Sequence, residues 1–524
     1  MRTRLVFNYV HLWLPSTPKL LMISGACVGL LCGLPQPASA QSGNSQATDW
    51  AAPAIRHALQ MRRFKDIDSG SDATPKAIPT LSKDKDPSGV VETYQSGAPT
   101  FTSSNAFFQN IGTNGRTCFT CHQPQNGWTV SAAGVQKRFA ASGGSDPIFR
   151  LVDGATCPTD NVKTIGDKRQ AYKLLIEKGL IRIGLAMPAN PQFEVTNVDD
   201  PYDCTTNPAT GLTSKTEGFV SVYRRPLPST NLDFLSTIMW DGREPNLASQ
   251  SIHATQGHAQ AVQPPTSGQQ TQIVDFETAL FTAQAFDNKA RRLNTDGAHG
   301  GPIALSDQLG DFFIGINDPL NQNPTGAAFD PDIFDLFNSP MWQGLQTMDE
   351  DEDDGIAKYR ASIARGERLF NTTKINITGV TGLNDALAQS SIPGFCGTCH
   401  DTPDVGNHSV KAPLNIGVAN AGADRPPALD ISALPVFTLK CTQGPLAGQT
   451  FVVTDPGRAL ISGDCADIGK LKGPILRGLA ARAPYFHNGS AATLLDVINF
   501  YDQRFTIGFT DREKTDLVNF LNAL

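Results

Sequence analysis

The sequence contains no hydrophobic run long enough to cross a bilayer. Its longest apolar stretch, LLMISGACVGLLCGL, covers only residues 20–34, whereas a membrane-spanning helix needs roughly 20 apolar residues. The chain also has no excess of positive charge, because 43 Lys and Arg oppose 50 Asp and Glu and the net charge is −7. These absences argue against a membrane span and against nucleic acid or an anionic membrane as a partner.

The N-terminus has the pattern of a secretory signal peptide. Arg2, Arg4 and Lys19 flank an apolar run, no acidic residue is present before residue 41, and PQPASA ends in a small-x-small cleavage pattern. We therefore expect residues 1–40 to be removed and the chain to be exported to the periplasm. Residues 41–100 are rich in Ser, Pro, Gly, Lys and Asp, so we expect an extended N-terminal arm.

The cysteines that follow the predicted signal peptide fall into two groups. The first group forms Cys118-Phe-Thr-Cys121-His122 and Cys396-Gly-Thr-Cys399-His400. The second group, without near neighbours, is Cys157, Cys204, Cys441 and Cys465. In an exported protein such isolated cysteines form disulfides by default. We expect Cys157 to pair with Cys204, and Cys441 with Cys465, because each pair lies between the same landmarks of its own half.

The C-x-x-C-H pattern is compatible with a redox dithiol, half of a zinc site or covalent haem attachment. A thioredoxin-like dithiol needs a βαβ context and zinc needs two more ligands at short spacing, and neither is evident here. Two thiols three residues apart add to the two vinyl groups of a haem, and the adjacent histidine then lies under the iron. We therefore expect two covalently bound haem c groups with His122 and His400 as proximal ligands.

The two motifs divide the chain into two predicted units. The first, residues 101–348, contains helical pieces such as residues 272–286. An acidic run within residues 349–355 is typical of a solvated linker. The second unit, residues 356–524, begins and ends with helical patterns and contains a short hairpin between its two isolated cysteines. The predicted fold is mainly α: two cytochrome c-like helical haem domains with long loops and a small β-hairpin insertion.

The segments IMWDGREPNLASQ and APYFHNGSAATL, with the two C-x-x-C-H motifs, resemble the bacterial di-haem cytochrome c peroxidase and MauG family. The resemblance covers most of the chain after the signal peptide. It implies that the first haem is the peroxidatic one, that the second stores electrons, and that Trp240 lies between them. Without the resemblance, a core aromatic is the simpler interpretation of Trp240.

The resemblance also implies a peroxide pocket formed after Trp240. Gln250 matches the glutamine of the family, whereas Gln260 stands where the family has an acid. An amide cannot shuttle a proton as a carboxylate does, so His258 becomes the candidate acid-base group; a hydrogen-bonded packing residue is the alternative, and the better interpretation of His253. No histidine lies between the first C-x-x-C-H and W-D-G-R, which indicates an open first haem, as in MauG.

No methionine follows Met348, so the methionine that ligates the second haem in these peroxidases is missing. Tyr501, sixteen residues after Tyr485, stands in its place, and MauG has a tyrosine ligand at the corresponding position. Tyr501 also shares the apolar face of a helical pattern and points inward; a buried tyrosine with an ordinary hydrogen bond is the alternative. His487 is the rival ligand, which the resemblance assigns to the haem pocket instead.

Family members often bind calcium through an asparagine fifteen residues before the tryptophan and carbonyls near Arg482 and Pro484. This sequence has Arg225 at the asparagine position. Calcium binding is therefore doubtful, and Arg225 is itself a candidate for the positive charge.

These features predict an exported di-haem oxidoreductase, a haem peroxidase of the cytochrome c peroxidase or MauG type. Hydrogen peroxide reacts at the His122 haem, and oxidising equivalents pass through Trp240 to the haem of His400 and Tyr501. The reductant is either an electron-donor protein or residues of a protein substrate. Two alternatives stay open: a non-enzymatic di-haem electron-transfer cytochrome, and a di-haem oxygenase of the kind that cleaves polyisoprene.

Overall fold

The computed structural model describes residues 74–204, 213–214, 219–344 and 354–524. These residues belong to one compact unit, Asp66–Leu524. The predicted signal peptide, the predicted arm up to residue 73 and residues 349–353 of the predicted linker lie outside the described residues. The division into two haem domains on either side of that linker stays a prediction.

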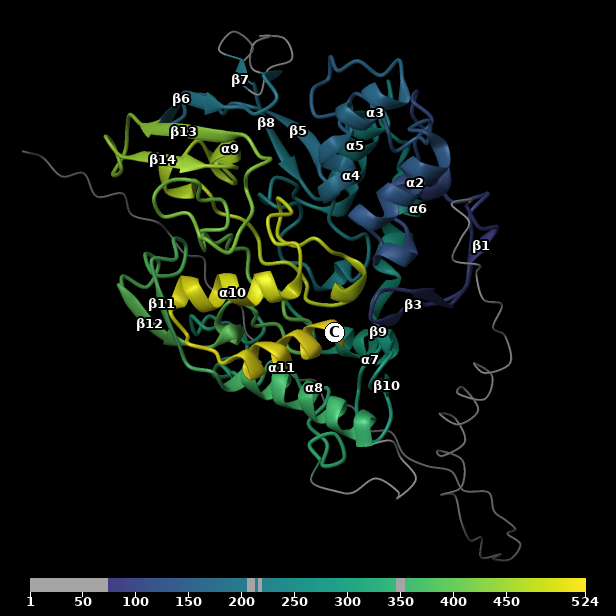
Figure 1. The fold of residues 1–524 in the computed structure, drawn as a ribbon, viewed down its shortest axis with the longest axis vertical. Coiled ribbons are helices and arrows are strands. Elements are labelled where there is room, and N and C mark those ends of the chain that lie inside the picture. The colour runs from purple at the N-terminus through teal and green to yellow at the C-terminus, as the bar shows by residue number, and fades with distance from the viewer. Residues whose placement is uncertain (1–73, 205–212, 215–218, 345–353) are drawn as a thin grey trace, which may run out of the picture. The chain divides into compact units, whose positions relative to one another are not determined.

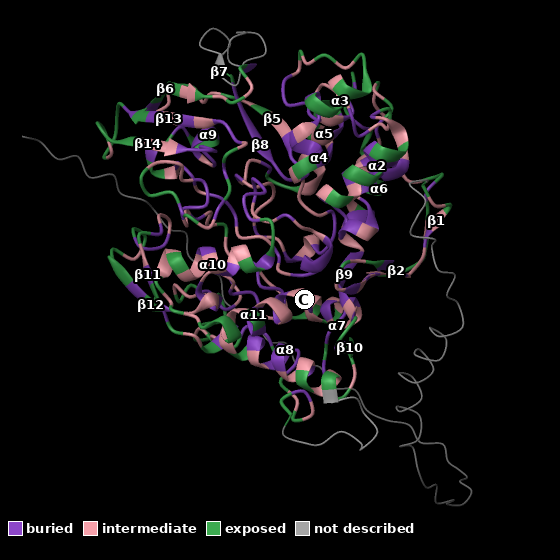
Figure 2. Ribbon diagram, in the orientation of Figure 1, coloured by how far each residue is buried: buried purple, intermediate pink, exposed green. Residues whose placement is uncertain are grey.

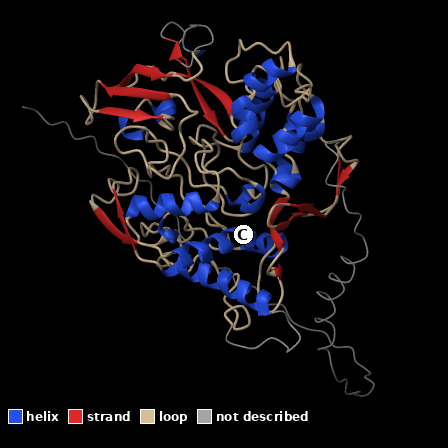
Figure 3. Cartoon of the chain, in the orientation of Figure 1, coloured by secondary structure: helices blue, strands red, loops and turns tan. Residues whose placement is uncertain are grey.

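Long loops connect the helices and strands along the described chain (Figures 1 and 3). The helices are α2 (Ala132–Ser142), α3 (Ile165–Ala171), α4 (Lys173–Lys178), α5 (Leu247–His258), α6 (Ser267–Thr278), α7 (Pro302–Asp307), α8 (Asp354–Thr372), α9 (Ala459–Ser462), α10 (Leu494–Phe505) and α11 (Asp511–Asn522). The strands are β1 (Ala77–Ile78), β2 (Leu81–Lys85), β3 (Gly89–Gln95), β4 (Thr100–Phe101), β5 (Ile181–Ala186), β6 (Phe193–Asp199), β7 (Thr213–Ser214), β8 (Phe219–Arg224), β9 (Leu280–Asp287), β10 (Arg291–Arg292), β11 (Ile375–Thr378), β12 (Ser391–Gly394), β13 (Val436–Cys441) and β14 (Thr450–Val453).

The prediction of a mainly α fold is wrong. Only 29% of the described residues are helical and 17% are strand, with the strands arranged in several sheets (Figure 3). Residues 272–286 show the reason, because α6 ends within them and the remainder pairs as β9 with β3. Aromatic and β-branched side chains fit a pleated surface, and a partner strand distant in sequence overrides the local helical pattern.

A four-stranded antiparallel sheet, in the order β10-β9-β3-β2, joins the described end of the predicted arm to the segment after α6. Buried and half-buried residues alternate along β3, so Thr93 points into the core. Its hydroxyl lies 2.9 Å from that of Thr282 on β9, and the indole of Trp128 donates to it at 2.9 Å. The sheet therefore fixes Trp128, which follows the first C-x-x-C-H motif closely in sequence.

A second sheet joins segments from the two halves of the sequence. Strand β6 pairs with β13, whose other neighbour is β14. Strands β13 and β14 form a hairpin, but it begins earlier than expected: β13 ends at Cys441, and only β14 lies between Cys441 and Cys465. These two cysteines are joined in a disulfide with their Cα atoms 6.1 Å apart, so this predicted pairing is confirmed.

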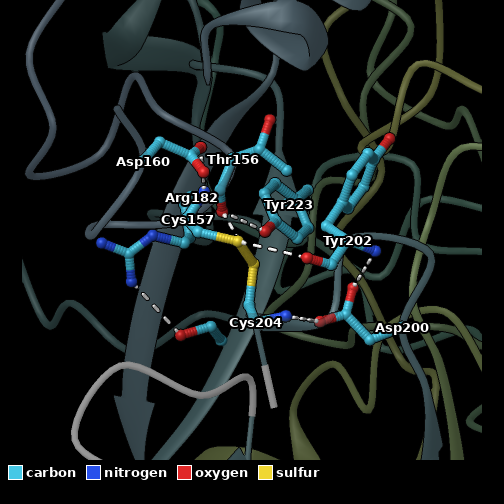
Figure 4. Close-up of a disulfide and its surroundings, with 9 residues drawn as sticks. Thr156, Cys157, Asp160, Arg182, Asp200, Tyr202, Cys204 and Tyr223 are labelled. Carbon is cyan, nitrogen blue, oxygen red and sulfur yellow. Dashed lines mark hydrogen bonds between the residues drawn. A yellow bond between two sulfur atoms is a disulfide. The ribbon is translucent and has the colours of Figure 1, made fainter. Parts of the chain in front are cut away.

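The other disulfide joins Cys157 to Cys204 beside β8, with Cα atoms 5.7 Å apart. Figure 4 shows that two carboxylates support it: Asp160 accepts from the backbone N–H of Cys157 at 2.9 Å, and Asp200 accepts from that of Cys204 at 2.6 Å. Both predicted disulfide pairings are therefore confirmed.

Two groups of helices carry most of the residues discussed below. Helix α5 packs against α6, and α11 packs against both α8 and α10. Polar caps fix where the helices begin: Asn246 accepts from the backbone N–H of Ser249 at 2.8 Å before α5, and Thr493 forms a capping box with Asp496 before α10. Their faces divide into buried and exposed sides (Figure 2). No helix in the described ranges is both long and apolar enough to cross a membrane.

Candidate functional site

Two cavities lie within the described unit, and each is lined by one C-x-x-C-H motif. Cys118, Cys121 and His122 contribute to the wall of the first. Cys396, Cys399 and His400 contribute to the wall of the second. The empty space between the walls measures about 1570 Å³ in the first cavity and 1580 Å³ in the second, including the open mouths. Each motif is therefore next to a space of similar size.

The two motif loops have the same local geometry. A single 3-10 turn spans Cys118–Thr120 in the first loop and Cys396–Thr398 in the second. In each turn the threonine hydroxyl accepts from the backbone N–H of the residue before the first cysteine, at 3.0 and 2.9 Å. The backbone N–H of each motif histidine donates to the carbonyl of the first cysteine, at 3.0 and 3.1 Å. This turn holds both thiols and the imidazole at the cavity wall.

The imidazoles of His122 and His400 are each held through Nδ1. In His122 this atom lies 2.9 Å from the carbonyl oxygen of Trp128, and in His400 it lies 2.7 Å from that of Gly406. A carbonyl only accepts, so Nδ1 donates and the Nε2 lone pair stays free. Burial lowers the pKa of His122 to about 4 and also lowers the pKa of His400. Both imidazoles are therefore neutral, the form that binds a metal.

The chemistry of the two motifs fits haem c better than zinc or a redox dithiol. Their four cysteines are free thiols. Within the described ranges no three His, Cys, Asp or Glu side chains are placed to hold a metal ion, so a zinc site lacks its other ligands. The strand pairs described are antiparallel, so no βαβ redox context is present in them.

Helix α5 faces the first cavity with a continuous stripe. The residues on this stripe are Leu247, Gln250, Ser251, Ala254, Thr255 and His258. Their spacing places them on one side of the helix. The structure therefore brings Gln250 and His258, two residues of the predicted peroxide pocket, to the same cavity as the first motif.

Helix α10 faces the second cavity in the same way. Its cavity-lining residues are Leu494, Val497, Ile498, Tyr501 and Phe505. The rings of Tyr501 and His400 have their centroids 6.5 Å apart and their planes at 72°. Burial raises the pKa of Tyr501, so a nearby cation is needed to favour its phenolate. The Tyr501 hydroxyl makes no hydrogen bond with the part of the chain that the structure describes, which disfavours an ordinary buried tyrosine.

The turns that precede α5 and α10 are equivalent. The matched residues, 247 positions apart (238 to 485), are Ile238 and Tyr485, Met239 and Phe486, Gly242 and Gly489, and Glu244 and Ala491. In each turn an antiparallel bridge joins the first and last of these residues. The second and third have positive φ, at 67° and 68° before α5 and at 63° and 63° before α10. A left-handed non-glycine residue is uncommon, so its presence at the same place in both turns indicates two copies of one structural unit.

Extending this equivalence along the helices shows how the two cavities differ. Ala254 of α5 corresponds to Tyr501 of α10, and His258 corresponds to Phe505. A methyl group in the first cavity therefore stands where the second has a phenol. The remaining differences are Gln250 and Ser251 in the first cavity against Val497 and Ile498 in the second.

Trp240 lines both cavities. Its indole N–H donates to the carbonyl of Arg225 at 2.8 Å, and its own carbonyl accepts from the backbone N–H of Lys472 at 2.9 Å. Lys472 also lines both cavities, and burial, together with the nearby charge of Arg482, lowers its pKa to about 7. The indole is thus fixed by backbone contacts on the wall shared by the two cavities.

Arg225 is a buried cation held by backbone carbonyls. Its guanidinium donates to the carbonyls of Val130 at 2.7 Å, Arg482 at 2.8 Å and Lys178 at 3.3 Å. Burial lowers its pKa to about 9, which still leaves it charged at neutral pH. The carbonyl of Arg482 belongs to the region that the resemblance assigned to calcium. Because the guanidinium already fills this carbonyl cluster, the residues present do not fit a calcium ion.

His487 is fully buried at the wall of the second cavity. Its ring lies 6.2 Å from that of Trp240, and its Nε2 lies 3.7 Å from a carboxylate oxygen of Asp455. Neither ring nitrogen has a hydrogen-bond partner in the described ranges, and burial lowers its pKa to about 4. An orphaned buried imidazole beside a cavity indicates that a bound group satisfies it.

Two other candidates lie away from the first cavity. His253 is on the opposite side of α5, with 66% of its side chain exposed and its Nδ1 2.7 Å from Glu244. Gln260 follows the end of α5, and its side-chain oxygen lies 3.4 Å from Asn114. Among His253, His258 and Gln260, His258 lines the cavity and the other two do not.

The sequence did not predict several charged residues on the cavity walls, among them Asp153, Glu277 and Lys472. Glu277 is buried with one carboxylate oxygen unpartnered among the described residues, and burial raises its pKa to about 7. Asp153 reaches the cavity from a loop that has no motif. Lys472 lies shortly before APYFHNG, and its only signal in the sequence is a charged residue inside a largely apolar segment.

Each of the two cavities is thus lined by a motif of the kind that attaches haem c. Residues 471–507 match the family model described as RoxA-like, cytochrome c-like. A stretch of 78 residues is 44% identical to cytochrome-c peroxidase IdrP2 of Denitromonas iodatirespirans, covering 14% of this chain and 21% of that protein. Cytochrome-c peroxidase IdrP2 of Pseudomonas sp. (strain SCT) is 27% identical over 168 residues, covering 28% of this chain and 43% of that protein.

These matches span less than half the length of the curated relatives. They confirm the resemblance to the bacterial di-haem cytochrome c peroxidase and MauG family. Among solved structures, the crystal structure of a MauG-like protein associated with microbial copper homeostasis is 15% identical, covering 59% of this chain and 75% of that one with a TM-score of 0.30.

Proposed function

We propose that this protein is an exported haem peroxidase of the cytochrome c peroxidase or MauG type, which reacts with hydrogen peroxide in the first cavity and stores or relays oxidising equivalents in the second. The contrast between Ala254 and Tyr501 carries the proposal. In the first cavity the facing helix presents a methyl group, which leaves space for a small oxidant. In the second, the phenol takes that space and faces His400.

The residues present fit one haem c in each cavity. Cys118, Cys121 and His122 would hold the first, and Cys396, Cys399, His400 and Tyr501 the second. The haems supply the redox chemistry, with reactivity set by whether the iron has an open axial position. Lys472 and His487 are buried polar groups beside the cavities, so we assign them to the haem carboxylates, which would satisfy them.

The other cavity residues have separable roles. The amide of Gln250 hydrogen-bonds the oxidant and orients it. Trp240 provides an aromatic path between the cavities, because its indole is fixed on the wall that they share. Electrons then come either from an electron-donor protein or from residues of a protein substrate.

Two further observations support the proposal. The relatives that match the chain are named cytochrome-c peroxidases. The two disulfides among the described residues support export to an oxidising compartment such as the periplasm, where disulfides persist.

Spectroscopy of the ferric holoprotein tests the proposal directly. We expect one high-spin and one low-spin haem, a change in both on addition of one equivalent of hydrogen peroxide, and peroxide-dependent oxidation of a reduced electron-donor protein. Two low-spin haems that do not respond to peroxide would favour a non-enzymatic electron carrier and overturn the proposal.

A di-haem oxygenase is the second candidate. It is favoured by the family model over residues 471–507, which is described as RoxA-like and not as a peroxidase. An oxygenase consumes dioxygen without added peroxide. Oxygen-electrode measurements with polyisoprene as the test substrate, compared with peroxide turnover, distinguish the two.

A further inference from the structure

A carboxylate and an imidazole form a close pair at the solvent-facing edge of the first cavity. Nδ1 of His258, at the end of α5, lies 2.6 Å from a carboxylate oxygen of Asp153. The side chain of Asp153 is only 6% exposed, whereas that of His258 is 38% exposed, and both line the cavity. The imidazole is therefore in contact with solvent and with the cavity at once.

Asp153 is fixed from its other side. Arg116 donates to its second carboxylate oxygen at 2.6 Å and is itself anchored by the carbonyls of Pro147 at 2.8 Å and Ile148 at 2.6 Å. Burial raises the pKa of Asp153, but the hydrogen bond from His258 and the charge of Arg116 outweigh burial and hold this pKa below its usual range. The carboxylate is therefore ionised and accepts the Nδ1–H of His258.

This arrangement fixes the tautomer of His258. With Nδ1 donating to Asp153, Nε2 carries the lone pair, and no residue in the described ranges is hydrogen-bonded to Nε2. The charged and titratable groups facing the pair are Arg116, Arg182, His122, Cys121 and Tyr172. The buried carboxylate stabilises the imidazolium that forms when Nε2 accepts a proton.

The imidazole–carboxylate pair at the second cavity does not reach solvent: His408 lines that cavity and lies 2.9 Å from Asp401, but the two side chains are only 6% and 0% exposed. Phe505 stands at the position that corresponds to His258, and no Asp or Glu of the described chain lines that cavity. Nor does Gln260, the residue at the family's acid position, line the first cavity. Among the described residues, the pair that reaches both a cavity and solvent therefore belongs to the first cavity.

We propose that Asp153 and His258 form a proton-transfer dyad at the mouth of the first cavity. The proposal rests on the proposed function, because it requires an incoming ligand in that cavity. A protonated ligand, hydrogen peroxide in the reaction, gives its proton to Nε2 of His258 as it binds in its anionic form. The imidazolium, stabilised by Asp153, then releases the proton to solvent at its exposed edge, and the neutral imidazole is restored. Asp153 is the positioning residue.

Hydrogen cyanide tests this step without turnover, because it loses a proton when it binds ferric haem as cyanide. The rate constant for cyanide binding to the ferric holoprotein is measured by stopped-flow Soret absorbance from pH 5 to 9. We expect a fall of about 100-fold at pH 7 for His258→Gln, since a positioned acid-base group contributes roughly 10²–10⁴. For Asp153→Asn we expect this rate constant to fall about tenfold, because the tautomer of His258 is no longer fixed.

His253→Gln is the matched control, because His253 lies on the same helix but does not line the cavity. It should leave the rate constant within twofold of that of the parent. Asp153→Asn leaves Arg116 buried without its partner and can unfold the protein, so His258→Gln is the decisive variant, with its fold checked by circular dichroism.

The outcomes separate the two proposals. If the parent binds cyanide and His258→Gln binds it at a rate within twofold of the parent's and with the same pH profile, the dyad is overturned and the proposed function stands. A parent that binds no cyanide overturns the open first haem and the dyad together.

Discussion

The two cavities share their attachment chemistry and differ in the helix that faces it. Both motif loops form the same 3-10 turn, and both histidines are anchored through Nδ1 to a backbone carbonyl. Helices α5 and α10 follow equivalent turns, but one presents Ala254 and His258 where the other presents Tyr501 and Phe505. A duplicated unit thus presents two different cavity walls through a few positions on one helix, while its C-x-x-C-H motif is unchanged.

Introducing a tyrosine into the first cavity, at the position that corresponds to Tyr501, should abolish the difference between the two cavities. Ala254→Tyr fills the space proposed for the oxidant, so we expect a loss of about a thousand-fold or more in peroxide-dependent turnover, or roughly 4 kcal/mol in transition-state stabilisation. The high-spin signal should disappear in the same variant.

Gln256→Tyr is the control for this variant, because it adds the same side chain to the exposed side of α5. A turnover rate for Ala254→Tyr equal to that of the control, with normal haem content, would refute the assignment of the open site.

Replacing Tyr501, the proposed ligand in the second cavity, tests the assignment of that cavity. Tyr501→Met replaces an anionic oxygen with a neutral thioether, which favours ferrous iron, so we expect the potential of the second haem to rise on the order of 150 mV. A potentiometric titration followed by absorbance measures it. Tyr501→Phe keeps the ring and should instead produce a high-spin second haem. An unchanged second-haem spectrum in both variants would remove Tyr501 as a ligand.

A buried carboxylic acid should make the first cavity sensitive to pH. Burial raises the pKa of Glu277 from 4.5 to about 7, so the folded state holds this proton more tightly than the unfolded state. The stabilisation is complete below pH 4.5 and is lost as the pH rises through about 7. By pH 7.5 the loss in the free energy of unfolding is roughly 3 kcal/mol.

Urea unfolding at pH 5 and pH 7.5 measures this loss. Glu277→Gln keeps the shape of the side chain without the ionisation. It should reduce the difference in the free energy of unfolding between the two pH values by about 2.4 kcal/mol, because about 0.8 kcal/mol of the loss has already occurred at pH 5. If the free energy of unfolding changes by the same amount between the two pH values in the parent and in the variant, the assignment of this loss to Glu277 is contradicted.

Trp240→Phe tests whether Trp240 connects the two cavities. It keeps an aromatic ring but loses the N–H that donates to Arg225. We expect the transfer of oxidising equivalents to the second haem to slow about tenfold, or 1.4 kcal/mol, as measured by stopped-flow absorbance after peroxide addition. Trp342→Phe is the control, because Trp342 is a buried tryptophan that lines neither cavity. Equal rates in the two variants would assign Trp240 to packing.

Local patterns allowed some features to be predicted from the sequence. The disulfide pairs followed from cysteine spacing, and the place of Tyr501 on the cavity face of α10 followed from helical periodicity. The equivalence of the turns before α5 and α10 was also accessible, since each carries a glycine four residues before the N-cap residue of its helix. Only the backbone angles make it clear. Such features depend on neighbours close in sequence.

The remaining features depend on contacts between distant segments. Strand β9 was expected to continue a helix, because its pairing with β3 cannot be inferred from its own residues. Asp153 belongs to a loop without a motif, and its role follows only from its contacts with His258 and Arg116. In the same way, nothing in the sequence around Lys472 indicates a role, and only the structure shows that it lines both cavities.

The guanidinium of Arg225 makes the wall beside Trp240 independent of any dissociable ion. Its positive charge is tethered to β8 through its neighbour Arg224 and bonded to three backbone carbonyls. A bound metal ion leaves when the surroundings are depleted of it, and a chelator accelerates that loss; a side chain of the chain itself cannot be extracted in this way. The geometry around Trp240 should therefore be the same in calcium-poor and calcium-rich surroundings.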